Sequence, residues 1–310
     1  MTMPFGERLA VAVRDVGAPV AVGLDPHLHR LPAPLRETYE GRTGRAFREA
    51  AAEAVVAFCA AALDGLAGRV AAVKPQVAFF EALGSPGVAA LEETCRAARE
   101  RGLLVIVDAK RGDIASTAAA YARAVLDPDG PLAADAMTVA PYMGTDTITP
   151  YLDICAEHGR GLFVLVRTTN PGSAALQHHG NPPLAEIVAK ALQRYGEQDG
   201  LVGASGLSSI GAVVGTTAAD EARALRRVMP RAWFLVPGLG AQGGSAADAL
   251  AGARGDGLGA LPVAARSVLF PSGPDAEFDA NPAASIERRA TDLVVAVRAA
   301  QQAPADVSGM

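Results

Sequence analysis

Short apolar segments rich in β-branched residues recur along the chain, and stretches with helical periodicity separate most of them. The eight segments are PVAVGLD (19–25), RVAAVKP (69–75), LLVIVDAK (103–110), AMTVAPY (136–142), GLFVLVRT (161–168), LVGAS (201–205), AWFLVPG (232–238) and LPVAARS (261–267). Alternating strands and helices imply a parallel sheet, and eight repeats favour a closed (β/α)8 TIM barrel. An open doubly wound sheet is the structural alternative, but no G-x-G-x-x-G follows the first strand, as a dinucleotide fold would require.

The intervening helices are visible as apolar faces at helical spacing. Residues 45–67 place Phe47, Val55 and Phe58 on one face, and residues 87–101 and 221–229 show similar patterns. The stretch 285–302 predicts a last helix that closes the barrel. We expect one barrel domain over residues 1–310, with insertions near 26–44 and 170–199.

The composition limits the classes of partner. The formal net charge is -5 and the isoelectric point is about 5.6, which argues against a nucleic-acid surface. The N-terminal MTMPFGERLA lacks the pattern of a signal peptide, and no apolar run reaches the length of a membrane span. Cys59, Cys95 and Cys155 show no C-x-x-C spacing. We therefore expect a cytoplasmic protein with reduced cysteines and no membrane or nucleic-acid partner.

A metal site is not indicated. His27 and His29 form an H-x-H pair, but no third ligand is evident near them in the sequence.

Charged residues gather where the predicted strands end. They are Asp25, Lys74, Asp108, Lys110, Arg167 and Arg266. Active sites of TIM barrels lie at the carboxyl ends of the strands, and residues two apart in a strand share a face. Asp108 and Lys110 therefore both point into the barrel mouth, with Lys74 as a neighbour. This cluster is either an array for proton transfer or a structural ion network that closes the barrel top.

Two loops carry weaker signals. Glycines in PGLGAQGG (237–244) allow backbone N–H groups to face an anion, and Arg266 at the end of the eighth strand could bind phosphate in a bidentate manner. This is where such barrels often hold phosphate, although the loop could also be a simple turn. RTTNPGS (167–173) offers hydroxyls and an amide to a polar ring, or forms a turn around Asn-Pro-Gly.

Together these motifs resemble the orotidine 5′-monophosphate decarboxylase family, in its longer bacterial branch. DAKRGDIAST (108–117) matches the signature D-x-K-x-x-D-I-x-x-T, and GLD (23–25), VKP (73–75), RTTNPG (167–172), PGLGAQGG and ARS (265–267) follow in the family's order. The resemblance covers roughly residues 20–270. It implies a metal-free and cofactor-free decarboxylation of orotidine 5′-phosphate to uridine 5′-phosphate in pyrimidine biosynthesis, by a homodimer.

The resemblance also implies roles for individual residues. The charged array would be Lys74, Asp108, Lys110 and Asp113, with Lys110 as proton donor and Asp113 reaching the site of the neighbouring subunit. The implied substrate-binding residues are Asp25, Thr117, Thr169, Pro237, Gln242, Gly243, Gly244 and Arg266. Among them, Asp25 would bind ribose hydroxyls, Thr117 would act across the dimer, and the last four would hold phosphate. Thr169 stands where the family often has serine, which keeps the hydroxyl and adds a methyl group.

Two other functions remain open at this stage. Mg²⁺-dependent phosphosugar enzymes of similar fold, such as hexulose-phosphate synthases and keto-gulonate-phosphate decarboxylases, share the D-x-K-x-x-D signature. They carry a metal-binding acidic residue at the end of the second strand, where this chain has Lys74. A non-catalytic nucleotide-binding barrel is the third hypothesis, and the complete charged array argues against it.

Overall fold

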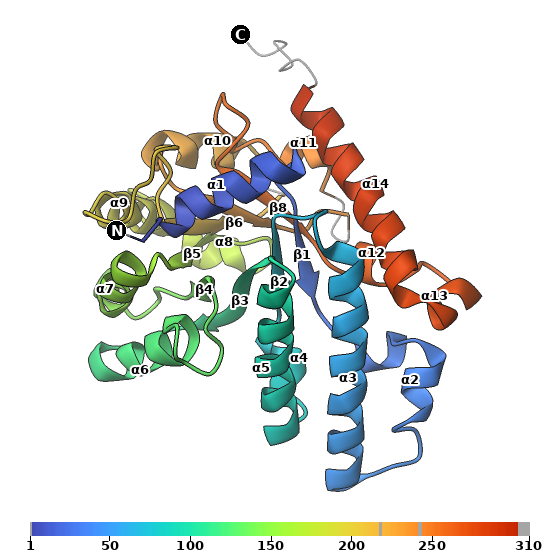
Figure 1. Ribbon diagram of the computed structural model, residues 1–310. Coiled ribbons are helices and arrows are strands. Elements are labelled where there is room, and N and C mark those ends of the chain that lie inside the picture. Colours follow the sequence, from blue (N-terminus) through green and yellow to red (C-terminus); the bar gives the residue numbers. More distant parts are fainter. Residues whose placement is uncertain (1, 217–218, 241–243, 303–310) are drawn as a thin grey trace.

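The computed structural model describes residues 2–216, 219–240 and 244–302, and its central feature is a closed barrel of parallel strands (Figure 1). The eight strands are β1 (Ala21–Leu24), β2 (Ala72–Pro75), β3 (Leu104–Arg111), β4 (Ala136–Val139), β5 (Gly161–Arg167), β6 (Ile210–Val214), β7 (Phe234–Pro237) and β8 (Ala260–Ala264). Each strand pairs with the next in the sequence, and Ala21 on β1 pairs with Val263 on β8 to close the ring. The predicted (β/α)8 barrel is confirmed.

Helices surround the barrel and connect its strands (Figure 1). They are α1 (Phe5–Val16), η1 (Leu28–Arg30), α2 (Ala33–Glu37), α3 (Gly44–Leu66), α4 (Val77–Glu81), α5 (Ser85–Glu100), α6 (Ala115–Leu126), η2 (Thr145–Ile148), α7 (Thr149–His158), α8 (Ser173–Gln177), α9 (Leu184–Gly196), α10 (Ala219–Val228), α11 (Ala246–Ala249), α12 (Arg266–Leu269), α13 (Ala276–Ala280) and α14 (Pro282–Gln302). The helices predicted at 45–67, 87–101, 221–229 and 285–302 correspond to α3, α5, α10 and α14.

The amino end of the barrel is closed by α1. Phe5, Leu9 and Val13 of this helix are buried in the same cluster as inward-facing strand residues such as Leu104 and Ile106. A buried tryptophan ties the helix in place, because Trp233 Nε1 donates a hydrogen bond to the Gly6 carbonyl at 3.0 Å. With this end filled, the carboxyl end of the barrel is where a ligand can enter.

The sixth strand is not where the sequence pattern predicted it. LVGAS (201–205) lies in a loop, in which the backbone N–H of Ser205 donates to the Glu7 carboxylate. The strand is Ile210–Val214 instead. It includes Gly211, a weak strand former, and a Cβ atom there would lie 2.6 Å from the Trp233 carbonyl oxygen. Packing against β7 therefore requires the glycine that concealed the strand.

The two segments expected as insertions contain regular structure. Residues 26–44 include η1 and α2, and α2 packs beside α3 (Figure 1). Residues 170–199 include α8 and also α9, whose Val188 and Leu192 are buried in the main hydrophobic cluster. Because α9 is the crossover helix between β5 and β6, the extra structure in this region is α8 with its flanking loops.

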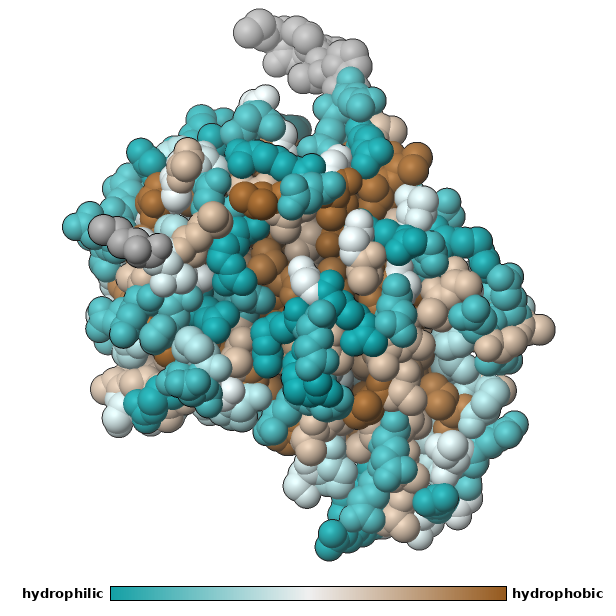
Figure 2. All heavy atoms as spheres, viewed as in Figure 1, coloured by the Kyte–Doolittle hydropathy of each residue, from teal (hydrophilic) through white to brown (hydrophobic). Residues whose placement is uncertain are grey.

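The surface and the cysteines agree with a globular barrel. Hydrophilic residues predominate on the face seen in Figure 2, and no helix in the described part of the chain is both long and apolar enough to cross a membrane. Cys59, Cys95 and Cys155 are free and buried. Burial raises the pKa of the Cys59 and Cys95 thiols to about 12, so both are uncharged at neutral pH.

Candidate active site

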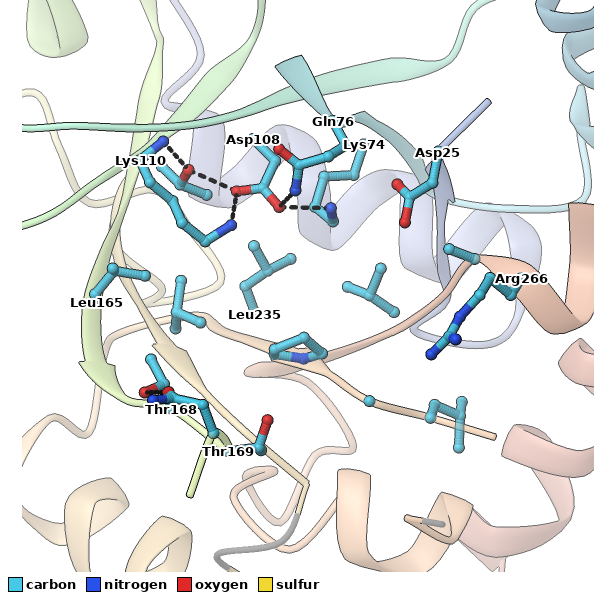
Figure 3. Close-up of a pocket in the computed structure, with 18 of the residues that line it drawn as sticks. Asp25, Lys74, Gln76, Asp108, Lys110, Leu165, Thr168, Thr169, Leu235 and Arg266 are labelled. Atoms are coloured by element: carbon cyan, nitrogen blue, oxygen red, sulfur yellow. Dashed lines mark hydrogen bonds and ion pairs between the residues drawn. The ribbon is translucent and has the colours of Figure 1, made fainter. Parts of the chain in front are cut away.

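A cavity of about 490 Å³ lies at the carboxyl ends of the strands (Figure 3). Its polar lining residues are Asp25, Lys74, Gln76, Asp108, Lys110, Thr138, Thr168, Thr169, Asn170, Gln177 and Arg266, and its apolar ones include Leu165, Val213, Leu235, Pro237 and Val263. All eight strands, or the loops directly after them, contribute to this lining. The size and the mixture of an apolar floor with convergent polar groups are typical of a small-molecule site.

The carboxylate of Asp108 is the centre of the polar side. Its Oδ2 accepts hydrogen bonds from Lys74 Nζ at 2.7 Å and from Gln76 Nε2 at 2.8 Å. Its Oδ1 accepts from Lys110 Nζ at 2.6 Å and from Thr138 Oγ1 at 2.8 Å. Four donors thus occupy the lone pairs of one carboxylate, which fixes its orientation.

The protonation state of Asp108 follows from these contacts. Burial by itself would raise the pKa of the carboxyl group, but the two lysine ammonium groups outweigh burial and hold the pKa well below its usual range. Asp108 is therefore ionised at neutral pH. It lies between Lys74 and Lys110, and all three side chains line the cavity at the barrel mouth, where the strand-end pattern predicted them.

Lys110 stands at a break in the sheet. The ladder between β3 and β4 shifts register between Val107 and Arg111, and Lys110 adopts a left-handed backbone with φ of 47°. Such a backbone costs a non-glycine residue about 1–3 kcal/mol, and such residues cluster at functional sites. The break lets the half-exposed ammonium of Lys110 reach the cavity while it remains bonded to Asp108.

Asp25 lies beside this array, at the end of β1. The residue is half-buried, and its Oδ1 is fully buried with no hydrogen-bond partner among the residues that the structure describes. Burial raises its pKa, Lys74 lowers it, and the net shift is upward. A buried carboxylate oxygen without a donor is costly, so this atom is suited to accept a hydrogen bond from a ligand hydroxyl.

Arg266 occupies the opposite end of the cavity from Lys110 (Figure 3). It is the first residue of α12, and it makes no ion pair with any residue within 2–216, 219–240 or 244–302. Pro237 lines the cavity nearby, and Gly244 follows in the same glycine-rich loop. Gln242 and Gly243, which were predicted to bind phosphate, lie outside the described residues.

The loop after β5 forms a third side of the cavity. Gln177 Oε1 accepts from the Thr168 backbone N–H at 2.9 Å, and Gln177 Nε2 donates to the Thr168 hydroxyl at 2.9 Å. This pair of bonds folds the loop back on itself. Thr169 lines the cavity, and its methyl group packs so closely on Gly215 that a Cβ atom there would collide with it.

Comparison with known proteins agrees with this geometry. The sequence profile of the orotidine 5′-phosphate decarboxylase / HUMPS family matches residues 20–280. The chain belongs to this family. Orotidine 5′-phosphate decarboxylase of Rhodopirellula baltica is 40% identical over 274 residues, which are 86% of this chain and 89% of that protein. The enzyme of Deinococcus radiodurans is 46% identical over 213 residues, which are 69% of this chain and 76% of that protein.

Solved structures of the family share the fold. A crystal structure assigned as an orotidine 5′-phosphate decarboxylase from Streptomyces avermitilis superposes with a TM-score of 0.79 and 36% identity, covering 98% of both chains. The OMP decarboxylase of Leishmania donovani gives a TM-score of 0.73 and 31% identity, covering 97% of this chain and 100% of that one.

Two residues of the family signature do not line this cavity. Asp113 lies in the loop between β3 and α6, where its Oδ1 accepts from the Ile114 backbone N–H at 2.8 Å. Thr117 is exposed on the first turn of α6. The structure therefore does not bring them into the site of their own chain.

Arg167 ends β5, as the sequence predicted, but its side chain does not line the cavity. The ladder between β5 and β6 shifts register between Leu165 and Arg167, so strand alternation does not hold there. Arg167 instead pairs with Glu221 of α10 at 2.7 Å and donates to the Thr168 carbonyl and the Ser173 hydroxyl. These contacts hold the loop after β5 in place, and Arg167 does not line the cavity.

Three polar lining residues were missed in the sequence. Gln76 stands two positions after Lys74, and Thr138 interrupts the apolar segment AMTVA, so each carries a weak signal of an inward-facing polar group. Gln177 gives no signal, because it reaches Thr168 only through the fold of the loop.

At the candidate metal pair, His27 packs edge-to-face on Phe79 with ring centroids 4.5 Å apart, and no group of three metal-binding side chains occurs within the described part of the chain.

Proposed function

We propose that the protein decarboxylates orotidine 5′-phosphate to uridine 5′-phosphate and CO₂, with Lys110 as the proton donor. The observation that carries the proposal is the ion-paired row Lys74–Asp108–Lys110 at one end of a cavity whose other end presents Arg266. The match to the family and to relatives named for this activity supports it.

The cavity suits the three parts of this substrate. Arg266 and the backbone of the loop that contains Gln242, Gly243 and Gly244 would bind the phosphate. Asp25, with its unpartnered Oδ1, would accept hydrogen bonds from the ribose hydroxyls. The pyrimidine would then lie over the apolar floor, with Thr169 at its polar edge and its carboxylate toward Asp108.

The chemical step follows from the charges. Asp108 is ionised, and at ~4 Å with an effective dielectric constant near ~20 it repels the substrate carboxylate by about 4 kcal/mol. Breaking the C6–carboxylate bond releases neutral CO₂, removes this repulsion and leaves the electron pair on C6. The ammonium of Lys110 stabilises the carbanion and then transfers a proton to C6. The ammonium of Lys110 supplies both the stabilisation of the carbanion and the proton, so the proposed step uses neither a metal nor an organic cofactor.

Binding energy from the phosphate supports this step at a distance. Phosphate contacts remain the same throughout the reaction, yet they hold the pyrimidine against Asp108, where the reaction relieves repulsion. Arg266 therefore contributes to the rate as well as to affinity.

The active unit of the proposal is a homodimer. Asp113 and Thr117 lie outside the lining of their own cavity, in the loop after β3 and on the first turn of α6, and exposed apolar side chains follow both β3 and the neighbouring strand β4. Ile114 is 52% exposed, Tyr142 81% and Met143 56%. Burial of these apolar side chains against a second copy would bring Asp113 and Thr117 to the neighbouring site. The proposed location is the cytoplasm, in accord with three free cysteines.

The Mg²⁺-dependent phosphosugar activity of related barrels is disfavoured by Lys74. This side chain is 7% exposed and its ammonium bonds to Asp108, so a divalent cation at the same carboxylate would meet a fixed positive charge. The test is the loss of orotidine 5′-phosphate absorbance with purified protein, in excess EDTA and in Mg²⁺. We expect equal rates in both. Turnover that EDTA abolishes and Mg²⁺ restores would refute the metal-free mechanism.

A further inference from the structure

One buried hydroxyl connects the two central residues of the charged array. Thr138 on β4 is 1% exposed. Its Oγ1 donates to Asp108 Oδ1 at 2.8 Å and accepts from the backbone N–H of Lys110 at 2.9 Å. Both contacts join positions 28 or 30 residues away in the sequence. Figure 3 shows both bonds as dashed lines beside Asp108 and Lys110.

The direction of these two bonds is fixed by chemistry. A backbone N–H can only donate, so the Thr138 oxygen must accept from Lys110. An ionised carboxylate can only accept, so the Thr138 proton must point at Asp108. The hydroxyl therefore has one possible orientation. It couples the position of the Lys110 backbone to the position of the Asp108 carboxylate.

The backbone around Lys110 explains why a side chain is needed at this point. Between Val107 and Arg111 the strand β3 carries three residues opposite Thr138 alone on β4. Lys110, with its φ of 47°, directs its N–H away from the regular ladder. The Thr138 hydroxyl serves as the acceptor that the ladder does not provide, and an apolar residue of the same shape would leave this N–H without a partner.

We propose that Thr138 is a positioning residue for the decarboxylation: its hydroxyl sets the backbone of Lys110 and the carboxylate of Asp108 relative to each other, so that the ammonium meets C6. This inference rests on the proposed role of Lys110 as proton donor. Thr138 itself does not transfer a proton, since its hydrogen is engaged by Asp108 throughout.

The test compares Thr138→Val, which keeps the shape and removes the hydroxyl, with Thr138→Ser, which keeps the hydroxyl. For Thr138→Val we expect kcat and kcat/KM to fall together by about 10- to 100-fold with KM nearly unchanged, the pattern for an interaction that acts on the transition state. Thr138→Ser should stay within about threefold of the wild type, because the positioning hydroxyl is retained.

Thr94→Val provides the matched control. Thr94 is 2% exposed, and its hydroxyl donates to the Ala90 carbonyl within α5 at 2.7 Å, remote from the cavity. This variant loses a buried hydroxyl of equal size but leaves no backbone N–H without a partner, so it should retain the wild-type kcat. A general effect of a lost buried hydroxyl would lower kcat in both.

Three results would overturn the proposal. They are an unchanged kcat in Thr138→Val, a Thr138→Ser variant as impaired as Thr138→Val, and an equal loss of kcat in Thr94→Val. Lys110→Ala, assayed in parallel, separates this inference from the proposed function. If Lys110→Ala is inactive while Thr138→Val is fully active, only the role of Thr138 fails. If Lys110→Ala is fully active, the proton donor is wrong and the role of Thr138 falls with it.

Discussion

The ammonium of Lys74 lies 2.7 Å from Oδ2 of Asp108, and both side chains are less than one tenth exposed. Each charge is thus removed from water and depends on the other. Lys110 binds the other oxygen of the same carboxylate but remains half-exposed to the cavity. The two lysines therefore differ in role. The buried Lys74 keeps Asp108 ionised, and Lys110 is accessible to a substrate.

Removal of Lys74 should destabilise the fold. Loss of Lys74 removes one of the two cations that compensate the buried Asp108 charge, so Lys74→Met should lower the free energy of unfolding by about 2 kcal/mol. Urea denaturation monitored by circular dichroism measures this change. Arg45→Met is the control, because Arg45 pairs with Glu49 on the exposed face of α3. Equal stability of the two variants would show that the pair does not hold the barrel top together.

Replacement of Asp25 should stabilise the protein while weakening substrate binding. The pKa of Asp25 is raised in the folded protein, chiefly by burial, so its ionised form opposes folding. This penalty is absent below the unfolded pKa of about 4 and grows as the pH rises through the folded pKa. Asp25→Asn should therefore increase Tm at pH 7 by about 2 °C or more, with a smaller gain at pH 4.

The same variant should bind substrate less well, because an amide replaces the acceptor proposed for the ribose hydroxyls. Differential scanning calorimetry at the two pH values and KM at pH 7 provide the test. A Tm difference that is larger at pH 4 than at pH 7 would have the wrong sign for a buried carboxylate with a raised pKa.

The contact between Thr169 and Gly215 predicts that a second substitution at Thr169 restores the substrate KM that a substitution at Gly215 impairs. Gly215→Ala places a methyl group where the Thr169 methyl already lies, so it should displace Thr169 and raise KM for orotidine 5′-phosphate by about tenfold. Gly215→Ala combined with Thr169→Ser removes the collision and should restore KM. Steady-state kinetics of the two single variants and the double variant decide this. No recovery in the double variant would mean that Gly215 acts through something other than Thr169.

The sequence predicted the parts of this site that depend on strand ends. Asp25, Lys74, Asp108 and Arg266 were placed correctly because the carboxyl ends of barrel strands meet at one edge. The failures have physical causes. The alternation of side chains along a strand does not predict where the register shifts. The position of Arg167 outside the cavity and the irregular backbone at Lys110 both follow such shifts. The sixth strand was misplaced because close packing there demands a glycine that mimics a turn.

Loop and interface residues were also beyond the sequence pattern. Gln177 reaches Thr168 across nine residues only because α8 folds the loop back. Asp113 and Thr117 gave a signal through the family signature alone, and their proposed partner surface belongs to a second copy of the chain.

Mixed dimers test whether Asp113 acts across an interface. Lys110→Ala and Asp113→Ala should each be inactive as homodimers. A hybrid dimer of the two would contain one site with both residues intact, so re-equilibrated equal mixtures should regain about a quarter of wild-type activity. The measurement is turnover before and after subunit exchange. If Asp113 served its own site, every site in the hybrid would lack one residue and no activity would return.

The most direct test of the central claim is the rate of orotidine 5′-phosphate decarboxylation by Lys110→Ala, with uridine 5′-phosphate binding measured in parallel. Lys190→Ala is the control, because Lys190 pairs with Glu186 on the surface of α9. If Lys110 donates the proton to C6, kcat should fall by about 10²- to 10⁴-fold in Lys110→Ala, with product binding largely retained and the control unaffected. A Lys110→Ala variant that turns over as fast as Lys190→Ala would contradict the account.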